Sequence, residues 1–335
     1  MDEAAPTRSL SHVVVVGDFF VDIQAQVACL PSWDGDVETP AVELLPGGSA
    51  ANTARQLQAL LPEKVRFFST TGAGDFDVAA GVLRRLDSQG FDTSGIRRIQ
   101  RASSCCIVLS GPQDRGFVSC YSSVKALAAE HLDREAVSSC SHLHIGGYFG
   151  LQGLQTQEFL ELVSAAKAQG ATVSLGTQSD FSGQWTGEDG HLSRLLPLVD
   201  LLICNNSEVQ EISKALGGPV LESFPGLTVV ETLGKGGSRA LGSEGRCATQ
   251  ASEVVESPVD TCGAGDAFAA GFLARWLRAV GPPGRLPEAE LLEALRWGNA
   301  CARRNVLRRG ACVEPVPRAE LLAELAAPGA AAPPG

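Results

Sequence analysis

The sequence contains no uninterrupted run of about 18 apolar residues, the length that a helix needs to cross a membrane. Its first residues are acidic and lack the apolar segment of a signal peptide. Basic residues are fewer than acidic ones: the chain has 27 Lys and Arg and 38 Asp and Glu, and its net charge is −11. We therefore expect no membrane partner and no nucleic-acid partner, because a phosphate backbone requires a basic face.

The sequence also lacks closely spaced pairs of cysteines of the kind that bind a metal. The ten cysteines include no C-x-x-C spacing of the kind that holds zinc, so free thiols in a reducing compartment are expected, with the cytoplasm as the simplest location. Two histidines, His142 and His144, alternate along an expected strand and could hold a metal. No third ligand accompanies them in the sequence, which favours histidines that pack in the core or at a cleft edge.

What the sequence does contain is an alternation of strand and helix patterns along most of its 335 residues. Strands are expected at 13–16, 65–69, 142–145, 172–175, 201–204 and 228–231, and helices at 50–61, 76–89, 154–169, 206–216, 265–280 and 288–307. This alternation predicts an α/β fold in which helices cover both faces of a mostly parallel sheet.

Two stretches interrupt the alternation, at about 23–46 and 97–123. Apolar and polar residues alternate in both, which predicts short antiparallel strands inserted into the α/β unit. The domain is expected to span 11–325, and the Ala/Pro/Gly-rich tail at 326–335 is expected to be disordered. The exposed face of the inserted strands would either stay bare or pair with a second subunit as a homodimer.

The segment Asp260-Thr261-Cys262-Gly263-Ala264-Gly265-Asp266 leads into an apolar helix pattern. Its glycines let the backbone approach a ligand, and the first helical amides, with the helix dipole behind them, form an anion-binding turn. Asp266 in the first turn is placed to accept a proton from a hydroxyl that attacks a phosphorus bound there. The alternative is an acidic residue that only favours the helix N-terminus, because a short glycine motif is weak evidence alone.

Further segments strengthen the first interpretation. The segment Gly47-Gly48-Ser49-Ala50-Ala51-Asn52 resembles the GGxxxN sugar-site motif of the ribokinase-like (PfkB) carbohydrate kinase family, and 260–266 resembles the C-terminal signature of that family. Four more segments follow in the family's order, namely Gly17 to Asp22, Thr71 to Asp75, Asn205 to Glu208 and Thr232 to Gly237. The resemblance covers about residues 12–315. It implies a three-layer α/β/α fold in which the inserted strands form a lid over the sugar.

The resemblance implies an ATP-dependent kinase that phosphorylates a hydroxymethyl group of a small sugar and uses Mg²⁺. Asp266 resembles the general base, and the amides of Gly263, Ala264 and Gly265 resemble the groups that bind the transferred phosphoryl. The remaining positions that the resemblance assigns are Asp22, Gly48 and Asn52 for the sugar and Asn205, Thr232, Gly234, Gly237 and Asn299 for the nucleotide. Asp22 could equally cap a turn.

Cation sites are implied at two places. Glu208 stands three residues after Asn205 and resembles a position that organises hydrated Mg²⁺, although this spacing also fits a helix capping box, and the two are compatible. Asp260 and the carbonyl of Cys262 resemble the family's potassium-binding positions, and Gly310 falls where a second loop would add carbonyls. The Cys262 thiol also precedes a helix N-terminus, which would lower its pKa if it faced the cleft. An inert, packed thiol is favoured, because a buried free cysteine is the usual case.

The identity of the acceptor stays open. Ser49 stands where relatives that bind phosphorylated sugars carry a basic residue, which favours a neutral, ribose-like or fructose-like sugar. Phe19 and Phe20 depart from the polar residue of ribokinase, and Gly176 and Gln178 depart from the Asp and Asn of fructokinase-like members. Aromatic groups near the sugar would also suit the base of an adenosine-like nucleoside, which is the alternative acceptor.

Two other classes of protein share features of this sequence. A nicotinamide-dependent oxidoreductase would share the α/β layout but needs a Gly-rich turn after the first strand, where this chain has Gly17-Asp18-Phe19-Phe20. A catalytically silent relative that serves as a binding protein conflicts with the intact 263–266 segment and with the presence of Asn205 and Glu208.

Overall fold

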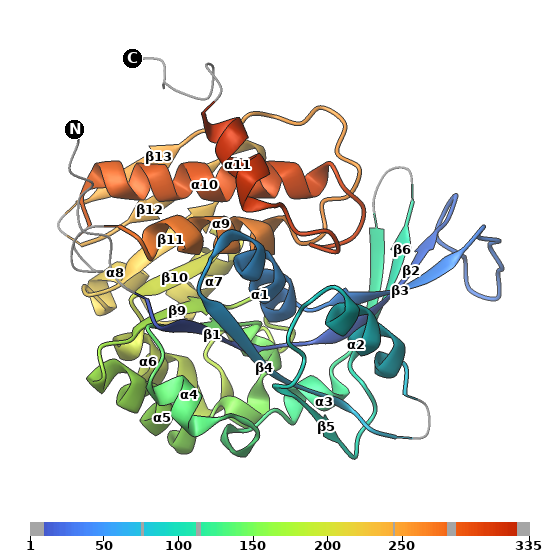
Figure 1. The fold of residues 1–335 in the computed structure, drawn as a ribbon, viewed down its shortest axis with the longest axis horizontal. Helices are drawn as coiled ribbons and strands as arrows, with labels where there is room; N and C mark the ends of the chain where they lie inside the picture. The colour runs from blue at the N-terminus through green and yellow to red at the C-terminus, as the bar shows by residue number, and fades with distance from the viewer. Residues whose placement is uncertain (1–9, 75–76, 112–114, 244, 280–285, 327–335) are drawn as a thin grey trace.

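A large sheet with helices on both faces forms the centre of the molecule (Figure 1). The computed structural model describes residues 10–74, 77–111, 115–243, 245–279 and 286–326. Within these residues the sheet has nine strands in the order β13-β12-β11-β10-β9-β8-β1-β4-β5. Their bounds are β1 His12–Gly17, β4 Lys64–Gly72, β5 Ile96–Ile99, β8 His142–Gly146, β9 Thr172–Gly176, β10 Leu201–Asn205, β11 Thr228–Thr232, β12 Ser238–Leu241 and β13 Cys247–Gln250. The strands from β11 to β5 pair in parallel, and β12 and β13 add an antiparallel edge.

Two layers of helices cover this sheet and create two hydrophobic cores. One layer holds α1 Ser49–Leu60, α2 Ala79–Ser88, α9 Ala264–Trp276, α10 Glu288–Val306 and α11 Arg318–Leu325. The other holds α3 Ser122–Lys125, α4 Arg134–Ser138, α5 Gln157–Ala168, α6 His191–Leu195, α7 Asn206–Ala215 and α8 Val220–Ser223. Side chains of a strand alternate between faces, so Val13 and Val15 enter the first core while Val14 and Val16 enter the second. The expected three-layer α/β/α architecture is confirmed.

A second, four-stranded sheet projects from one side of the body and forms the lid (Figure 1). Its order is β3-β2-β6-β7, with bounds β2 Phe20–Gln26, β3 Val42–Gly47, β6 Cys105–Ser110 and β7 Arg115–Cys120. The sequence predicted antiparallel strands here, and two of the three pairings are antiparallel. The β2–β6 pairing is parallel, because both strands enter the lid from the main body in the same direction.

Other differences from the expected elements are local. The stretch from 97, expected in the lid, starts inside β5, which pairs with β4 in the large sheet. Strands β12 and β13 and helix α11 carried no clear periodic signal and were not expected. Asp75 and the tail from 327 lie outside the described residues. Among the described helices, none combines the length and the apolar composition that a membrane crossing requires.

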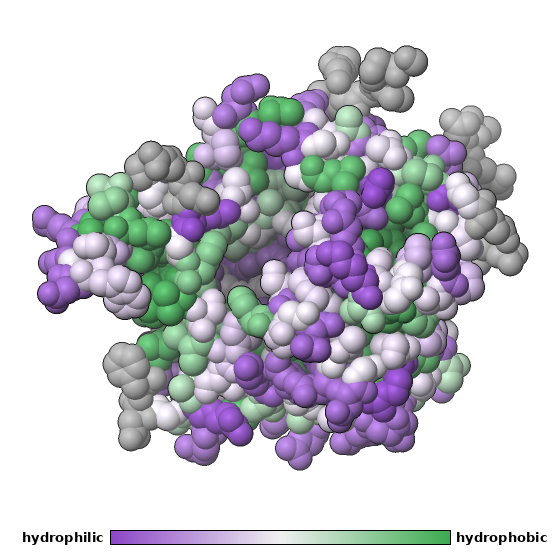
Figure 2. All heavy atoms as spheres, turned by 180° about the vertical axis from the view of Figure 1, so that it is seen from behind, coloured by the Kyte–Doolittle hydropathy of each residue, from purple (hydrophilic) through white to green (hydrophobic). Residues whose placement is uncertain are grey.

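The two faces of the lid differ in character. By register, Val42 and Leu44 of β3, Ile107 of β6 and Val118 of β7 share the outer face, where they are between 39% and 63% exposed. The opposite face carries Asp22 and Gln24 together with apolar residues such as Phe117, and its Gln24 side chain reaches Asp260 of the body. Figure 2 shows apolar side chains gathered on the lid, at the left of that view, and a hollow between the lid and the body. The lid therefore closes one side of a cleft.

Helix α9 is held against α10 by close packing at Gly271. A Cβ built on Gly271 would lie 2.7 Å from the Trp297 carbonyl oxygen and 2.9 Å from the Cys301 Sγ. We predict that Gly271→Ala lowers the free energy of unfolding by about 1–3 kcal/mol through overpacking. Gly81→Ala is the matched control, because this exposed helical glycine has no atom within 4 Å of a built Cβ and alanine should stabilise the helix by about 0.5–1 kcal/mol. Urea unfolding of both variants checks the prediction, which fails if the two changes have the same sign.

Candidate active site

The site begins at the sharp turn that starts α9. Gly263 is the N-cap with φ +70°, and a Cβ there would lie 2.7 Å from the Ala311 Cβ, so both backbone and space require glycine. Gly265 has no atom within 4 Å of a built Cβ, and its side of the turn is open. The first-turn amides have no preceding helical carbonyls, and the Ala264 amide makes a long hydrogen bond of 3.4 Å to the Thr261 carbonyl oxygen, so the geometry of this open turn suits an anion.

Asp266, in the first turn of α9, is only 8% exposed, and side chains from two segments donate hydrogen bonds to its carboxylate. The Ser49 hydroxyl donates to its Oδ1 at 2.7 Å, and the Asn52 Nδ2 donates to its Oδ2 at 2.9 Å. Gln178 Nε2 lies 3.4 Å from the same Oδ1 and donates to the Ser49 Oγ at 2.9 Å. The start of α1 and the loop after β9 thus converge on one buried carboxylate.

Three carboxyl groups near the α9 turn have raised pKa values, and one of them, Asp266, borders a cavity. Burial raises the pKa of Asp266 to about 7, against the lowering effect of the Asn52 and Ser49 hydrogen bonds. Burial also raises the pKa of Asp22 to about 7, with a further contribution from the charges of Asp18, Asp266 and Asp260. Burial likewise raises the pKa of Asp18 to about 6. Groups that titrate near neutral pH in a cleft are typical of catalytic sites.

Asp18 was not singled out from the sequence. Its carboxylate accepts the amides of Ser49 at 3.1 Å and Ala50 at 2.7 Å, and so it caps α1. Gly48 precedes that helix with φ +99°, and a Cβ there would lie 2.5 Å from the Asp18 carbonyl oxygen. Asp18 therefore fixes the turn that presents Ser49 and Asn52 to Asp266. Its place directly after a buried strand was the available signal, because ligand-facing residues of parallel sheets occur at strand ends.

The predicted nucleotide residues line two cavities that meet at the α9 turn. A cavity of about 300 Å³ is bordered by the 263–266 turn, Asn205, Glu208 and Thr232. A second cavity of about 270 Å³ is bordered by Thr232, Gly234, Gly237 and Asn299. Thr232, Thr261, Ala264 and Gly265 line both. The structure thus brings these predicted positions together along one continuous groove.

Asn205 and Glu208 form the capping box that their spacing allowed. Asn205 Oδ1 accepts the Glu208 amide at 2.9 Å, and Glu208 Oε2 accepts the Asn205 amide at 3.0 Å. Glu208 is 7% exposed, and burial raises its pKa. Asn299 Nδ2 donates to the Gln250 carbonyl oxygen at 3.1 Å, which ties α10 to the end of β13 beside the second cavity.

Asp260 and Cys262 precede the turn and are already engaged by protein groups. Asp260 forms an ion pair with Arg115 of the lid at 3.0 Å, and the Cys262 carbonyl accepts the Asn305 Nδ2 at 2.7 Å. The Cys262 thiol does not have the lowered pKa that a cleft-facing position would give it, which agrees with the favoured expectation of an inert thiol. Burial and the charge of Asp260 raise the pKa of this thiol to about 12, and the nearby Arg115 offsets only part of the rise. The thiol is therefore protonated at neutral pH.

His142 and His144 pack in the core, which is the arrangement that the sequence favoured over a metal site. Both are buried, and Ser174 Oγ lies 2.9 Å from His142 Nε2 and 2.8 Å from His144 Nδ1. Burial lowers the pKa of His144 to about 4. Across the described residues, no group of three or more His, Cys, Asp or Glu is arranged to hold a metal.

The chain resembles known proteins over most of its length. Residues 10–319 match the pfkB family of carbohydrate kinases. An ATP-dependent ribose-1-phosphate kinase from Halopiger xanaduensis is 27% identical over 303 residues, 90% of this chain and 93% of that protein. An adenosine kinase from Schizophyllum commune is 28% identical over 276 residues, 75% of this chain and 78% of that protein. The structure of Arabidopsis thaliana ribokinase complexed with ribose and ATP aligns with a TM-score of 0.74 at 20% identity, covers 96% of this chain and 100% of that one, and shows the shared fold.

The raised pKa of Asp266 has a consequence for stability. Between about pH 4 and pH 7 the folded protein retains a proton that the unfolded chain has lost, so this group makes stability fall as pH rises through that window. Asp266→Asn removes the effect, and Asn52 Oδ1, which is buried without a partner among the described residues, can accept from the new amide. We predict that the variant is more stable than the wild type at pH 8 by at least about 1 kcal/mol, and that this difference shrinks at pH 5.

Chemical unfolding at both pH values measures this difference. Asp36→Asn, which neutralises an exposed carboxylate, serves as the control and should show no such pH-dependent gain. A variant with the same stability relative to wild type at pH 5 and pH 8 would contradict the raised pKa.

Proposed function

The chain belongs to the pfkB family of carbohydrate kinases, and on that premise we propose that it transfers the γ-phosphoryl group of ATP to a hydroxymethyl group of a small neutral sugar. The observation that carries the proposal is the position of Asp266. This buried carboxylate, with a pKa near 7, stands in the first turn of a helix whose open N-terminus can bind an anion. A proton acceptor and a phosphoryl-binding turn are thus adjacent, as phosphoryl transfer to an alcohol requires.

In this proposal Asp266 accepts the proton of the attacking hydroxyl. A pKa near the working pH suits a general base, because enough carboxylate is present and its affinity for the proton is high. The amides of Gly263, Ala264 and Gly265 stabilise the negative charge that develops on the transferred group. Gln178 and Ser49 orient the carboxylate by their hydrogen bonds.

The sugar would bind between the lid and α1, at Asp22, Gly48 and Asn52. Asn52 Oδ1 supports this assignment, because a buried acceptor without a protein partner in the described chain is suited to a sugar hydroxyl. Asp22 lies close enough to Asp18, Asp266 and Asp260 for their charges to raise its pKa, and this proximity supports its assignment to the sugar site. Ser49 brings no positive charge there, which favours a neutral acceptor.

The nucleotide would occupy the continuous groove that ends at the α9 turn. Thr232, Gly234, Gly237 and Asn299 would border its base and ribose, and Asn205 would lie near the phosphates. Glu208 fits a role in holding hydrated Mg²⁺, because the cap engages its Oε2 and its carboxylate still borders the cavity. Bound Mg²⁺ would neutralise phosphate charge. The ten free thiols favour a reducing compartment such as the cytoplasm.

Of the cofactors that the sequence led us to expect, potassium fits the residues at its expected site least well. A potassium ion would be bound by several oxygen atoms, and a cationic side chain paired with one of them competes with the ion by charge and by space. Asp260 accepts the amides of Cys262 and Gly310 and also pairs with the Arg115 guanidinium, and the Cys262 carbonyl accepts from Asn305. With Arg115 in place this donor set does not fit a potassium site, and potassium has no part in the mechanism proposed here.

A nucleoside is the second candidate acceptor, and an aromatic cluster favours it. Phe20 and Tyr121 meet edge to face at 4.8 Å, and Tyr121 and Phe181 at 5.5 Å. Phe117, Tyr121 and Phe181 border a cavity of about 890 Å³ beneath the lid, and Phe181 is 78% exposed. Exposed rings beside a sugar site can stack on a purine base. The relative from Schizophyllum commune is an adenosine kinase, which makes nucleosides a necessary part of any substrate screen.

Measuring ADP formation tests the proposed function. The panel contains ribose, fructose, ribose 1-phosphate and adenosine, and we expect a neutral sugar to give the highest kcat/KM. Asp266→Asn should lower kcat by about 10²-fold or more while ATP still binds, which is the scale of a lost general base. Asn52→Ala should raise KM for the acceptor far more than KM for ATP, because it removes a partner from one end of the cleft only. Turnover that survives in Asp266→Asn, or ADP formation with no acceptor at all, would contradict the proposal.

We also propose that the chain forms a homodimer through the outer face of the lid. Val42, Leu44, Ile107 and Val118 form a contiguous exposed apolar face, and burial of such a face favours association. Val118→Asp should convert the dimer to a monomer in light scattering. Leu322→Asp alters an exposed apolar residue on α11 and should leave the mass unchanged. A wild-type chain with the mass of a monomer at micromolar concentration would rule out the dimer.

A further inference from the structure

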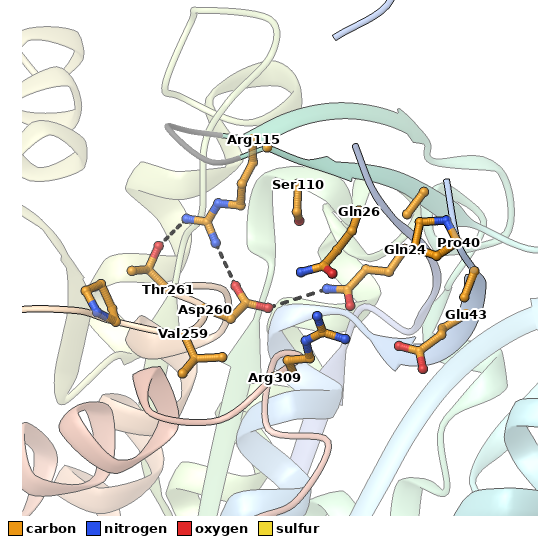
Figure 3. A pocket seen from close by; sticks show the side chains of 14 residues that line it. Gln24, Gln26, Pro40, Glu43, Ser110, Arg115, Val259, Asp260, Thr261 and Arg309 are labelled. Atoms are coloured by element: carbon orange, nitrogen blue, oxygen red, sulfur yellow. Dashed lines mark hydrogen bonds and ion pairs between the residues drawn. The ribbon is translucent and has the colours of Figure 1, made fainter. Parts of the chain in front are cut away.

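The lid contributes a positive charge to the base of the anion-binding turn. Arg115, the first residue of β7, extends from the lid toward the loop that precedes α9 (Figure 3). Its Nη1 lies 3.0 Å from Asp260 Oδ1 and donates to the Cys262 Sγ at 2.8 Å, and its Nη2 donates to the Thr261 hydroxyl. One guanidinium therefore contacts three consecutive residues immediately before Gly263.

This contact is shielded from solvent. The Arg115 side chain is 23% exposed and that of Asp260 is 11% exposed, so the pair lies mostly outside bulk water and salt screens it weakly. The Phe117 ring lies 5.7 Å from the guanidinium and supports it from the side. Gln24 of the lid lies 3.5 Å from the other Asp260 oxygen, so two lid strands meet the loop at one carboxylate.

The same carboxylate organises the turn. Asp260 Oδ1 accepts the Cys262 amide at 2.8 Å and Oδ2 accepts the Gly310 amide at 3.0 Å. Asp260 thereby connects the 260–263 segment to the loop after α10. Its negative charge stands close to the turn that must bind phosphate oxygens, and an uncompensated carboxylate there would repel them.

We propose that the Arg115 guanidinium takes the place of a monovalent cation at Asp260, so that closure of the lid itself supplies the charge that orders the anion-binding turn. Arg115 is then a positioning residue that acts through Asp260 and Thr261, and Thr261 borders both nucleotide cavities. A guanidinium suits this place because it is always charged and its planar fork donates to several acceptors at once. The inference rests on the proposed kinase function and adds a dependence of the turn on the lid.

The structure also offers a matched control. Arg309 borders the same cavity of about 400 Å³ as Arg115 (Figure 3). Its side chain is exposed, and among the described residues it forms no hydrogen bond or ion pair with Asp260. Arg309→Ala removes one positive charge from the same cavity without removing the contact to Asp260. It separates the specific role of Arg115 from a general loss of positive charge.

The experiment compares wild type, Arg115→Ala, Arg115→Lys and Arg309→Ala in potassium chloride and in tetramethylammonium chloride at equal ionic strength. We expect the wild type and Arg309→Ala to differ less than about twofold between the two salts. In tetramethylammonium, Arg115→Ala should lose about tenfold or more in kcat, on the scale of a misplaced reacting group. Potassium, or guanidinium chloride below denaturing concentration, should restore several-fold of this loss, and Arg115→Lys should keep part of the activity in either salt.

Thermal unfolding supplies a readout that does not need turnover. Potassium should raise the melting temperature of Arg115→Ala relative to tetramethylammonium by about 2 °C or more, because a bound cation stabilises the folded state, and it should leave the wild type unchanged. If Arg115→Ala does not fold, Arg115→Gln carries the same test. If no acceptor is phosphorylated, the proposed function fails, and the melting data still decide the role of Arg115.

Three results would overturn the inference. The first is a wild type that potassium activates or stabilises several-fold more than tetramethylammonium does, since the cation would then have its own site. The second is Arg115→Ala with wild-type kcat in tetramethylammonium. The third is Arg115→Ala with lost activity that neither potassium nor guanidinium restores and with a melting temperature that potassium does not change, which would make Arg115 a structural ion pair only.

Discussion

The burial of the Asp266 carboxylate at the start of α9 is the constraint on which the site depends. A buried carboxylate is costly unless hydrogen bonds compensate it, and here Ser49 and Asn52 provide them. Those two residues reach Asp266 only because Asp18 caps α1 at a fixed position beside β1. The compensation is incomplete, and the pKa near 7 is the result. For the general-base role that we propose, incomplete compensation is an advantage, because a fully stabilised carboxylate would hold a proton too weakly.

Four carboxylates converge behind the lid, and each is compensated differently. Backbone amides of α1 hold Asp18, side-chain donors hold Asp266, and a guanidinium from the lid pairs with Asp260. The pKa of Asp22 is raised by burial and, in addition, by the charges of the other three carboxylates. A negatively charged cleft of this kind repels phosphates unless cations accompany them, so nucleotide binding requires both the α9 turn and compensating charge. Arg115 supplies part of that charge from a separate sheet, which connects the position of the lid to the electrostatics of the nucleotide groove.

The fold makes this convergence possible. Parallel strands deliver their carboxyl ends to one edge of the sheet, and residues at the ends of β9, β10 and β11 therefore border one cleft although they are far apart in the chain. Close packing of α9 on α10 at Gly271 holds the anion-binding turn rigid from behind. The lid is a separate small sheet that meets the body where β3 packs on α1 and α2 and where Arg115 and Gln24 reach Asp260. The two sides of the site are thus built from different sheets.

The sequence by itself determined the elements whose signals are local. The period-2 and period-3.6 patterns predicted β1, β8 to β11 and the long helices, the glycines at 263 and 265 predicted the anion-binding turn, and the spacing of Asn205 and Glu208 allowed the capping box that is present. Only the tertiary structure decided what depends on distant neighbours. Arg115 pairs with Asp260 across 145 positions, Asp18 caps a helix 31 positions later, β2 pairs with β6 in parallel, and the Cys262 pKa rises although its place before a helix would by itself lower it. The physical reason is that periodicity and turn preference act within a few residues, whereas desolvation and charge pairing depend on which segments the fold brings together.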